Sequence, residues 1–120
     1  FEQENIEEIF TKLKTLINNG NDFAATIEKE LLVKSPTSLK ITMRQILEAK
    51  DMNLKDELIM EYRMVQKCQT SGDFYEGVRA MLVDKDRKPQ WQPSLLSKVD
   101  DIWVNHFFES LNEKDLKITD

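Results

Sequence analysis

The sequence predicts an all-α protein of five to six amphipathic helices. Apolar residues recur at intervals of three and four almost throughout, and this spacing places them on one side of a helix. No stretch shows the sustained alternation of apolar and polar residues that a half-buried strand requires. Residues that favour helix ends also punctuate the chain at intervals typical of helix lengths.

The first two helices are expected before residue 35. Asn5 is the predicted N-cap of the first, with Glu8 as its capping-box partner. Residues 18–20, Asn-Asn-Gly, are expected to end it because they tolerate left-handed backbone. A shorter helix then begins at Asp22. The residues expected on the inward faces are Ile6, Ile9, Phe10, Leu13, Leu16 and Ile17 in the first helix, and Phe23, Ile27 and Leu31 in the second.

Two longer helices are expected next. Ser35 is suited to the N-cap and Pro36 to the first helical turn, where no backbone donor is needed. Residues 50–53 are predicted to form a turn, and Asn53 to cap the longest helix. The stripes expected to face inward are Leu39, Met43, Ile46 and Leu47 in one helix, and Leu54, Leu58, Tyr62, Val65 and Cys68 in the other.

A fifth helix is expected after residues 70–72. Asp73 and Glu76 have the spacing of a second capping box, and Gly77 is expected to let two helices approach closely. This local partner favours a structural role for Glu76 over a catalytic one. The stripe expected on this helix comprises Phe74, Val78, Met81 and Leu82.

The remainder is expected to be less regular. Residues 84–93 hold two of the three prolines and are predicted to form a loop that packs through Trp91. A last short helix is expected to open at residue 100 or 101. The polar tail, residues 112–120, is expected to fray. The apolar residues of the last helix are Ile102, Trp103, Phe107 and Phe108.

Charge and composition exclude several function classes. The chain has 17 Lys and Arg against 22 Asp and Glu, a net charge of −5, which argues against binding to a nucleic-acid backbone. No window approaches the ~18 uninterrupted apolar residues of a membrane span. The single cysteine, Cys68, can form no intrachain disulfide or cysteine cluster for zinc, and it suggests a reducing compartment. Neither GxGxxG nor GxxxxGK[ST] is present.

No residue is a strong candidate for catalysis or for metal binding. His106, the only histidine, is interpreted as structural or surface-exposed rather than catalytic. Cys68 is interpreted as a small buried hydrophobe rather than a reactive thiol. The acidic pairs at 7–8 and 100–101 are adjacent in sequence, and adjacent helical side chains diverge. They are therefore expected to be solvated or to be N-terminal charges that favour the helix dipole.

A basic segment follows the fifth helix. Lys85, Arg87 and Lys88 lie beside Trp91 in the predicted loop and could meet phosphate groups. A solvated loop is the simpler interpretation, because two interleaved aspartates reduce the net positive field.

Five short motifs, in this order and at these intervals, resemble one family. They are Ser35–Thr42 (SPTSLKIT), Met60–Arg63 (MEYR), Asp73–Ala80 (DFYEGVRA), Leu82–Asp86 (LVDKD) and Pro89–Pro93 (PQWQP). The set resembles the C-terminal part of the 3-hydroxyisobutyryl-CoA hydrolases, a family of the crotonase (enoyl-CoA hydratase/isomerase) superfamily. The resemblance implies hydrolysis of a CoA thioester in valine breakdown, typically in mitochondria, with no other cofactor.

The resemblance also implies a domain organisation. Members of the family have a spiral β/α core followed by a helical C-terminal region, and their catalytic groups belong to the core. Residues 1–120 are therefore expected to be one helical region without the spiral core. The chain begins at Phe1 rather than Met, so it is expected to be a processed product or an excised piece.

One ligand contact is implied by the resemblance. In the superfamily, a lysine and an apolar or aromatic residue after the Glu-Gly pair can approach the adenine end of CoA. Met81 and Lys85 are the nearest matches here. Met81 replaces the usual aromatic residue, and one extra residue precedes Lys85.

Two functions remain in view. The chain is either the C-terminal segment of a CoA-thioester hydrolase, which covers the active site or makes subunit contacts, or a non-catalytic crotonase-derived module in a larger assembly. The expected partners are the spiral core of the parent protein and further copies of that protein in a homo-oligomer, without nucleic acid or membrane. The segments that carry the core carboxylates and the oxyanion donors would distinguish these functions.

Overall fold

The computed structural model describes residues 5–118, and this part of the chain is all-α, as predicted. It contains six α-helices, one π-helix and two short 3₁₀-helices. Their bounds are α1 Ile6–Asn18, α2 Asp22–Leu32, α3 Pro36–Ala49, α4 Leu54–Gln69, α5 Gly72–Val78, η1 (π) Arg79–Val83, η2 (3₁₀) Leu96–Lys98, α6 Asp101–His106 and η3 (3₁₀) Asn112–Lys114.

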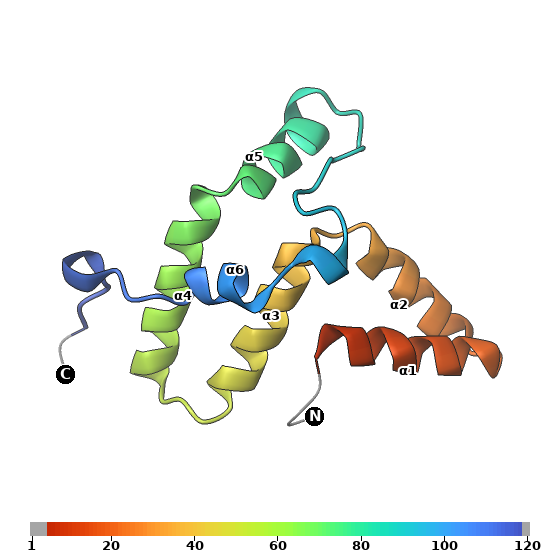
Figure 1. Cartoon of the computed structure of the whole chain (residues 1–120), viewed down its shortest axis with the longest axis horizontal. Coiled ribbons are helices and arrows are strands. Elements are labelled where there is room, and N and C mark those ends of the chain that lie inside the picture. Colours follow the sequence, from red (N-terminus) through yellow and green to blue (C-terminus); the bar gives the residue numbers. More distant parts are fainter. Residues whose placement is uncertain (1–4, 119–120) are drawn as a thin grey trace.

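The helices form two hairpins and a projecting arm (Figure 1). Helices α1 and α2 make one hairpin and α3 and α4 make the other, while α1 also contacts α3. Helix α6 crosses the α3–α4 hairpin, and α5 with η1 extends beyond the end of α4. The chain returns from η1 through an irregular segment that passes the start of α3 before it reaches α6.

All six α-helices described here begin with a side-chain N-cap. In each, the side-chain oxygen of the N-cap residue accepts a hydrogen bond from the N–H three residues later, at 2.8–3.4 Å. Such caps satisfy a backbone donor that has no partner within the helix. The N-caps predicted for α1, α3 and α4 are confirmed. The six N-caps are Asn5, Asn21, Ser35, Asn53, Ser71 and Asp100.

The end of α1 is also as predicted. Gly20 adopts a left-handed φ of 87°, and its N–H donates to the carbonyl of Ile17 at 2.9 Å. Glycine reaches this backbone conformation without a steric penalty, so it terminates the helix and allows the turn into α2.

The main core lies where α6 crosses the α3–α4 hairpin. Phe107, at the end of α6, is 2% exposed and packs against Ile41 of α3 and Met60 and Met64 of α4. Partly buried side chains complete the cluster, among them Cys68 and Phe108. A buried aromatic placed directly after the six-residue helix α6 thus joins the two long helices.

The predicted inward faces of α2, α4 and α5 are wrong in part. Phe23 of α2 is 73% exposed and Ala24 is buried in its place. On α4, Met60 and Met64 face the core, whereas Leu54 is 71% exposed. Helix α4 carries apolar residues on two faces, and periodicity cannot decide which of them packs within this chain. The other predicted inward residues that are exposed are Leu16, Ile46, Leu58, Val65, Phe74, Met81 and Leu82.

The C-terminal segment is held in place, contrary to the expected fraying of residues 112–118. Asp115 accepts two hydrogen bonds from the Arg63 guanidinium, at 2.9 and 2.8 Å. The same carboxylate accepts from the Ser110 hydroxyl and the Leu111 N–H. Arg63 and Asp115 are 52 residues apart in sequence, so no local pattern predicts this contact. Residues 119 and 120 lie outside the described part of the chain.

This pair gives a testable pH dependence. The hydrogen bonds from Arg63 hold the pKa of the Asp115 carboxyl well below its usual range. The pair therefore stabilises the fold above the unfolded pKa of about 4, and this stabilisation is lost as the pH falls through the lower folded pKa. Asp115→Asn should lower Tm at neutral pH and make the decline of Tm below about pH 5 shallower.

Circular dichroism melts of the 120-residue chain between about pH 3 and 7 measure this effect. Asp51→Asn, at an exposed position in the α3–α4 turn, is the control and should leave the curve unchanged. Parallel curves for Asp115→Asn and the unmodified chain would contradict the assignment.

Candidate functional site

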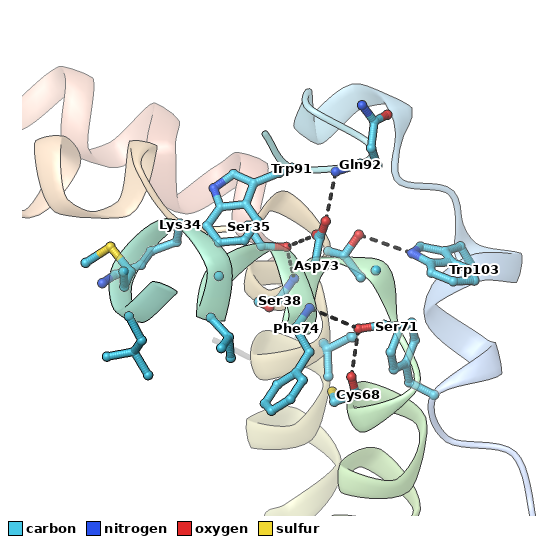
Figure 2. A pocket seen from close by; sticks show the side chains of 18 residues that line it. Lys34, Ser35, Ser38, Cys68, Ser71, Asp73, Phe74, Trp91, Gln92 and Trp103 are labelled. Atoms are coloured by element: carbon cyan, nitrogen blue, oxygen red, sulfur yellow. Dashed lines mark hydrogen bonds between the residues drawn. The ribbon is translucent and has the colours of Figure 1, made fainter. Parts of the chain in front are cut away.

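A pocket of about 540 Å³ lies between the start of α3, the α5–η1 arm, the loop that contains Trp91, and α6. Figure 2 shows the side chains that line it. Most of the lining is apolar, with a few polar groups near the start of α3. The apolar lining includes Ile41, Phe74, Val78, Met81, Leu82, Trp91, Trp103 and Phe107.

Asp73 joins three segments at the edge of this pocket. Its carboxylate accepts a hydrogen bond from the Ser35 hydroxyl at 2.5 Å and from the Gln92 N–H at 2.9 Å (Figure 2). Ser35 in turn caps α3, so one carboxylate connects α3, α5 and the loop. Asp73 was expected to cap α5, but Ser71 does so and the helix begins at Gly72.

Two tryptophans form walls of the pocket, and both indole N–H groups have partners. Trp91 donates to the carbonyl of Val33 at 3.0 Å, and Trp103 donates to the Thr37 hydroxyl at 3.1 Å. The indole rings therefore present apolar surface to the pocket while their polar atoms are satisfied. Packing of the loop through Trp91 is as predicted.

Gly77 makes a close approach possible, but its neighbour is not a helix. A Cβ placed on Gly77 would lie 3.4 Å from Cη2 of Trp91. The expected helix–helix approach is therefore wrong in its partner, because the loop aromatic occupies the space above this residue.

Glu76 is held by a different interaction from the predicted capping box. Both of its oxygens accept from the Arg79 guanidinium at 2.7 Å, and one also accepts from the Gln90 N–H at 2.6 Å. The guanidinium lowers the pKa of Glu76 to about 2. This carboxylate is therefore ionised at neutral pH and fully engaged in the structure, a poor arrangement for a general acid.

Arg79 also organises the loop that follows. It donates to Asp84 at 2.9 Å and to Asp86 at 2.8 Å. The backbone of Lys85 and Arg87, which flank Asp86, is left-handed, with φ of 57° and 58°. The side chains of both cations are exposed.

The predicted site residues occupy different places. Met81 lines the pocket and is half-exposed, whereas Lys85 lies outside the lining, in the loop after η1. Cys68 also lines the pocket, and burial raises the pKa of its thiol, which disfavours the reactive thiolate. His106 stacks on Trp103 with ring centroids 5.6 Å apart and is not part of the lining.

The most important polar contacts of the pocket could not be predicted from the sequence. Ser35 and Asp73 are 38 residues apart, and Thr37 and Trp103 are 66 residues apart. Local patterns gave Ser35 and Trp91 structural roles but carried no signal for their long-range partners.

Between residues 5 and 118, no three His, Cys, Asp or Glu side chains lie together as a metal-binding group. The same residues include no helix that is long and apolar enough to cross a bilayer.

The contact at Gly77 gives a second prediction. Because 3.4 Å is an ordinary contact distance, Gly77→Ala should fit and should raise stability by about 0.5–1 kcal/mol through helix propensity. Gly77→Leu should displace Trp91 and cost about 1–3 kcal/mol. Gly72→Leu is the matched control, since a Cβ placed on Gly72 would have no atom within 4 Å. Urea unfolding of the chain measures these changes, and an equal loss for both leucine variants would refute the contact.

Comparison with known proteins gives a consistent result. A family profile described as enoyl-CoA hydratase/isomerase matches residues 1–108. The mitochondrial 3-hydroxyisobutyryl-CoA hydrolases of Danio rerio and Homo sapiens are 47% and 44% identical to the chain, over 118 and 117 residues. Each match covers 98% of this chain and 30% of the relative, so the chain spans less than a third of these relatives.

Two solved structures are also similar to the chain. An enoyl-CoA hydratase from Rhodobacter sphaeroides has a TM-score of 0.85 at 27% identity, covering 97% of this chain and 34% of its own. A carnitinyl-CoA dehydratase from Mycobacterium thermoresistibile has a TM-score of 0.77 at 28% identity, covering 88% of this chain and 30% of its own. The helical arrangement, the profile match over nine-tenths of the chain and the hydrolase relatives agree: the chain belongs to the enoyl-CoA hydratase/isomerase family, the crotonase superfamily.

Proposed function

We propose that residues 1–120 form the helical C-terminal region of a 3-hydroxyisobutyryl-CoA hydrolase and cover the substrate pocket of a catalytic core that lies on other segments. The observation that carries this proposal is the uncovered apolar surface of the α5–η1 arm. The hydrolase relatives, which are about three times longer than the match, support the identity of the parent protein.

The α5–η1 arm is charged on the side of the returning loop, through Asp73, Glu76 and Arg79, and carries large apolar residues elsewhere. Ala80 is its only buried residue, and large apolar side chains are exposed around it. Contiguous exposed apolar patches of this kind mark interaction sites. The exposed side chains are Phe74, Tyr75, Met81, Leu82 and Val83.

The dimensions of the chain support the same proposal. Its radius of gyration is 16.3 Å, whereas a compact chain of this length has about 14 Å. Its accessible surface is 8712 Å², against about 6,700 Å² for a monomer of this mass. The excess surface fits a segment that packs on a larger body.

The carboxylates at and beside the pocket favour a catalytic centre elsewhere. Thioester hydrolysis needs donors that stabilise the oxyanion and a carboxylate that activates the attacking group. Here Asp73 is bound by Ser35 and Gln92, and Glu76 is bound by Arg79 and Gln90. Both carboxylates already have structural partners.

Met81 and Lys85 are proposed to contact the CoA part of the substrate. Relative to the superfamily pattern, one extra residue precedes Lys85. The π-helix η1 ends two residues before Lys85, and the Asp84 N–H donates to the Arg79 carbonyl, five residues back, at 2.8 Å. A π-turn holds one residue more than an α-turn, so it offers a way to absorb the extra residue. This geometry supports the proposed role of Lys85.

The remaining features of the proposal come from the relatives. Their names place them in mitochondria, and we propose the same location and a role in valine breakdown for the parent of this chain. We propose the spiral core as its main partner and further copies of the same protein as the next. Under this proposal the substrate is a CoA thioester and no other cofactor is needed.

The first test of this function is thiol release from 3-hydroxyisobutyryl-CoA, followed with a thiol reagent. The complete protein that carries this chain should turn over the ester, and the 120-residue chain alone should not exceed buffer. Turnover by the chain alone would refute a catalytic centre located elsewhere. An inactive complete protein would favour the non-catalytic crotonase-derived module instead.

The second test concerns Lys85. In the complete protein, Lys85→Ala should raise KM for the CoA thioester by about threefold to tenfold, because an exposed charge–phosphate contact contributes on the order of 1 kcal/mol. The value of kcat should change little, since this contact is remote from the reacting bond. Lys50→Ala, at an exposed position after α3, is the control. An unchanged KM would remove Lys85 from the site.

A further inference from the structure

We infer that Arg79 is a positioning residue for the phosphate-bearing end of the substrate: it withdraws the carboxylates of the loop and fixes Lys85 and Arg87 as an outward-facing cationic pair. This inference rests on the CoA contact proposed above. It differs from the expectation that the aspartates of the loop neutralise its positive charge.

Arg79 binds the acidic side chains around it. Three carboxylates, those of Glu76, Asp84 and Asp86, all accept hydrogen bonds from the single Arg79 guanidinium. Its Nη2 also lies 3.5 Å from the carbonyl of Lys88. Arginine has five N–H donors in a planar fork, which allows one side chain to engage several acceptors at once.

This arrangement affects the basic residues of the loop. Because both aspartates are turned toward Arg79, neither is paired with Lys85 or Arg87. The side chains of these two cations are exposed and make no hydrogen bond or ion pair with any residue from 5 to 118. The loop therefore offers two unpaired cations to solvent, whereas the carboxylates of Asp84 and Asp86, at 54% and 42% exposure, are bonded to Arg79.

The backbone of the loop is also constrained. Lys85 and Arg87 both adopt left-handed φ values, which are unfavourable for residues with a Cβ. Such conformations persist where the surroundings fix them, and they concentrate at ligand-binding sites. Here the fixing contacts are the Arg79 bonds to the residues on either side of Lys85, together with a bond from the Arg87 N–H to the Ala80 carbonyl at 2.9 Å.

The chain connects this pair of cations to the pocket. The same loop continues to Gln90, whose N–H is held by Glu76, and then to Trp91, which forms a wall of the pocket. Arg79 therefore fixes, through Glu76, the segment between the cations and the apolar pocket. An elongated ligand with a phosphorylated end and an apolar or neutral arm fits this arrangement, since guanidinium and ammonium groups bind phosphate.

The test uses the complete protein with two substrates, the CoA thioester and the corresponding pantetheine thioester, which lacks the phosphorylated nucleotide. Arg79→Lys retains the charge but loses the fork, and Arg79→Met loses both. We expect KM for the CoA thioester to rise at least threefold in Arg79→Lys and further in Arg79→Met, with kcat within twofold and KM for the pantetheine thioester unchanged. Equal changes for both substrates, or none, would overturn the inference.

Arg63→Met is the matched control, because Arg63 makes a similar bidentate pair with Asp115 outside the loop. It should lower Tm without changing the ratio of the two KM values. Limited trypsin digestion gives a readout that needs no substrate: cleavage after Lys85 and Arg87 should accelerate at least threefold in Arg79→Lys but not in Arg63→Met. Unchanged cleavage would refute the positioning role even if the Met variant fails to fold.

The outcomes separate this inference from the proposed function. If Lys85→Ala raises KM for the CoA thioester and the Arg79 variants do not, the inference fails and the CoA contact stands. If neither changes KM, the CoA contact fails as well. If the complete protein turns over no thioester, the proposed function fails together with the ligand assigned here.

Discussion

The Asp73 carboxylate is the interaction on which the pocket depends. It binds the N-cap of α3 through Ser35 and the returning loop through Gln92, and it belongs itself to α5. The other connections are pairwise: Glu76 and Arg79 hold the loop on the arm, and Trp91 contacts Gly77 and donates to the Val33 carbonyl. A partly buried charge is stable only when hydrogen bonds replace its lost hydration, and here donors from two distant segments do so. The walls of the pocket are therefore positioned by polar contacts, with Asp73 at their centre, as well as by apolar packing.

Packing within the chain covers only part of its apolar surface. Phe107 draws α3, α4 and α6 into one core, and a second hairpin, α1–α2, lies beside it. The apolar side chains of the α5–η1 arm, and Leu54 and Leu58 of α4, are not packed into this core. Hydrophobic burial is the main favourable term in folding, so surfaces of this kind indicate an interface. The comparisons agree, since every relative and solved structure described above is about three times as long as the segment it shares with this chain.

Electrostatic effects in the loop depend on direction as well as on composition. A count of residues 84–88 gives two acidic and three basic side chains, close to neutral. All five side chains are exposed, but the two acids are bonded to Arg79 and are not paired with Lys85 or Arg87. Local potential follows from where charges lie, and a ligand meets the outward face only. The same segment combines a π-helix with two left-handed residues, an arrangement that holds its shape through side-chain contacts.

The sequence by itself determined the all-α class, the positions of the helices and most of their caps, because these depend on residues within four positions of one another. It also contained the motifs of the superfamily. Only the tertiary structure decided which face of α4 is buried, that Asp115 anchors the C-terminal segment, and that Glu76 binds Arg79 rather than the start of its own helix. Helical periodicity identifies apolar faces but not their partners, and the Ser35–Asp73 and Arg63–Asp115 contacts join residues 38 and 52 positions apart. Contacts at that range arise only when the chain has folded.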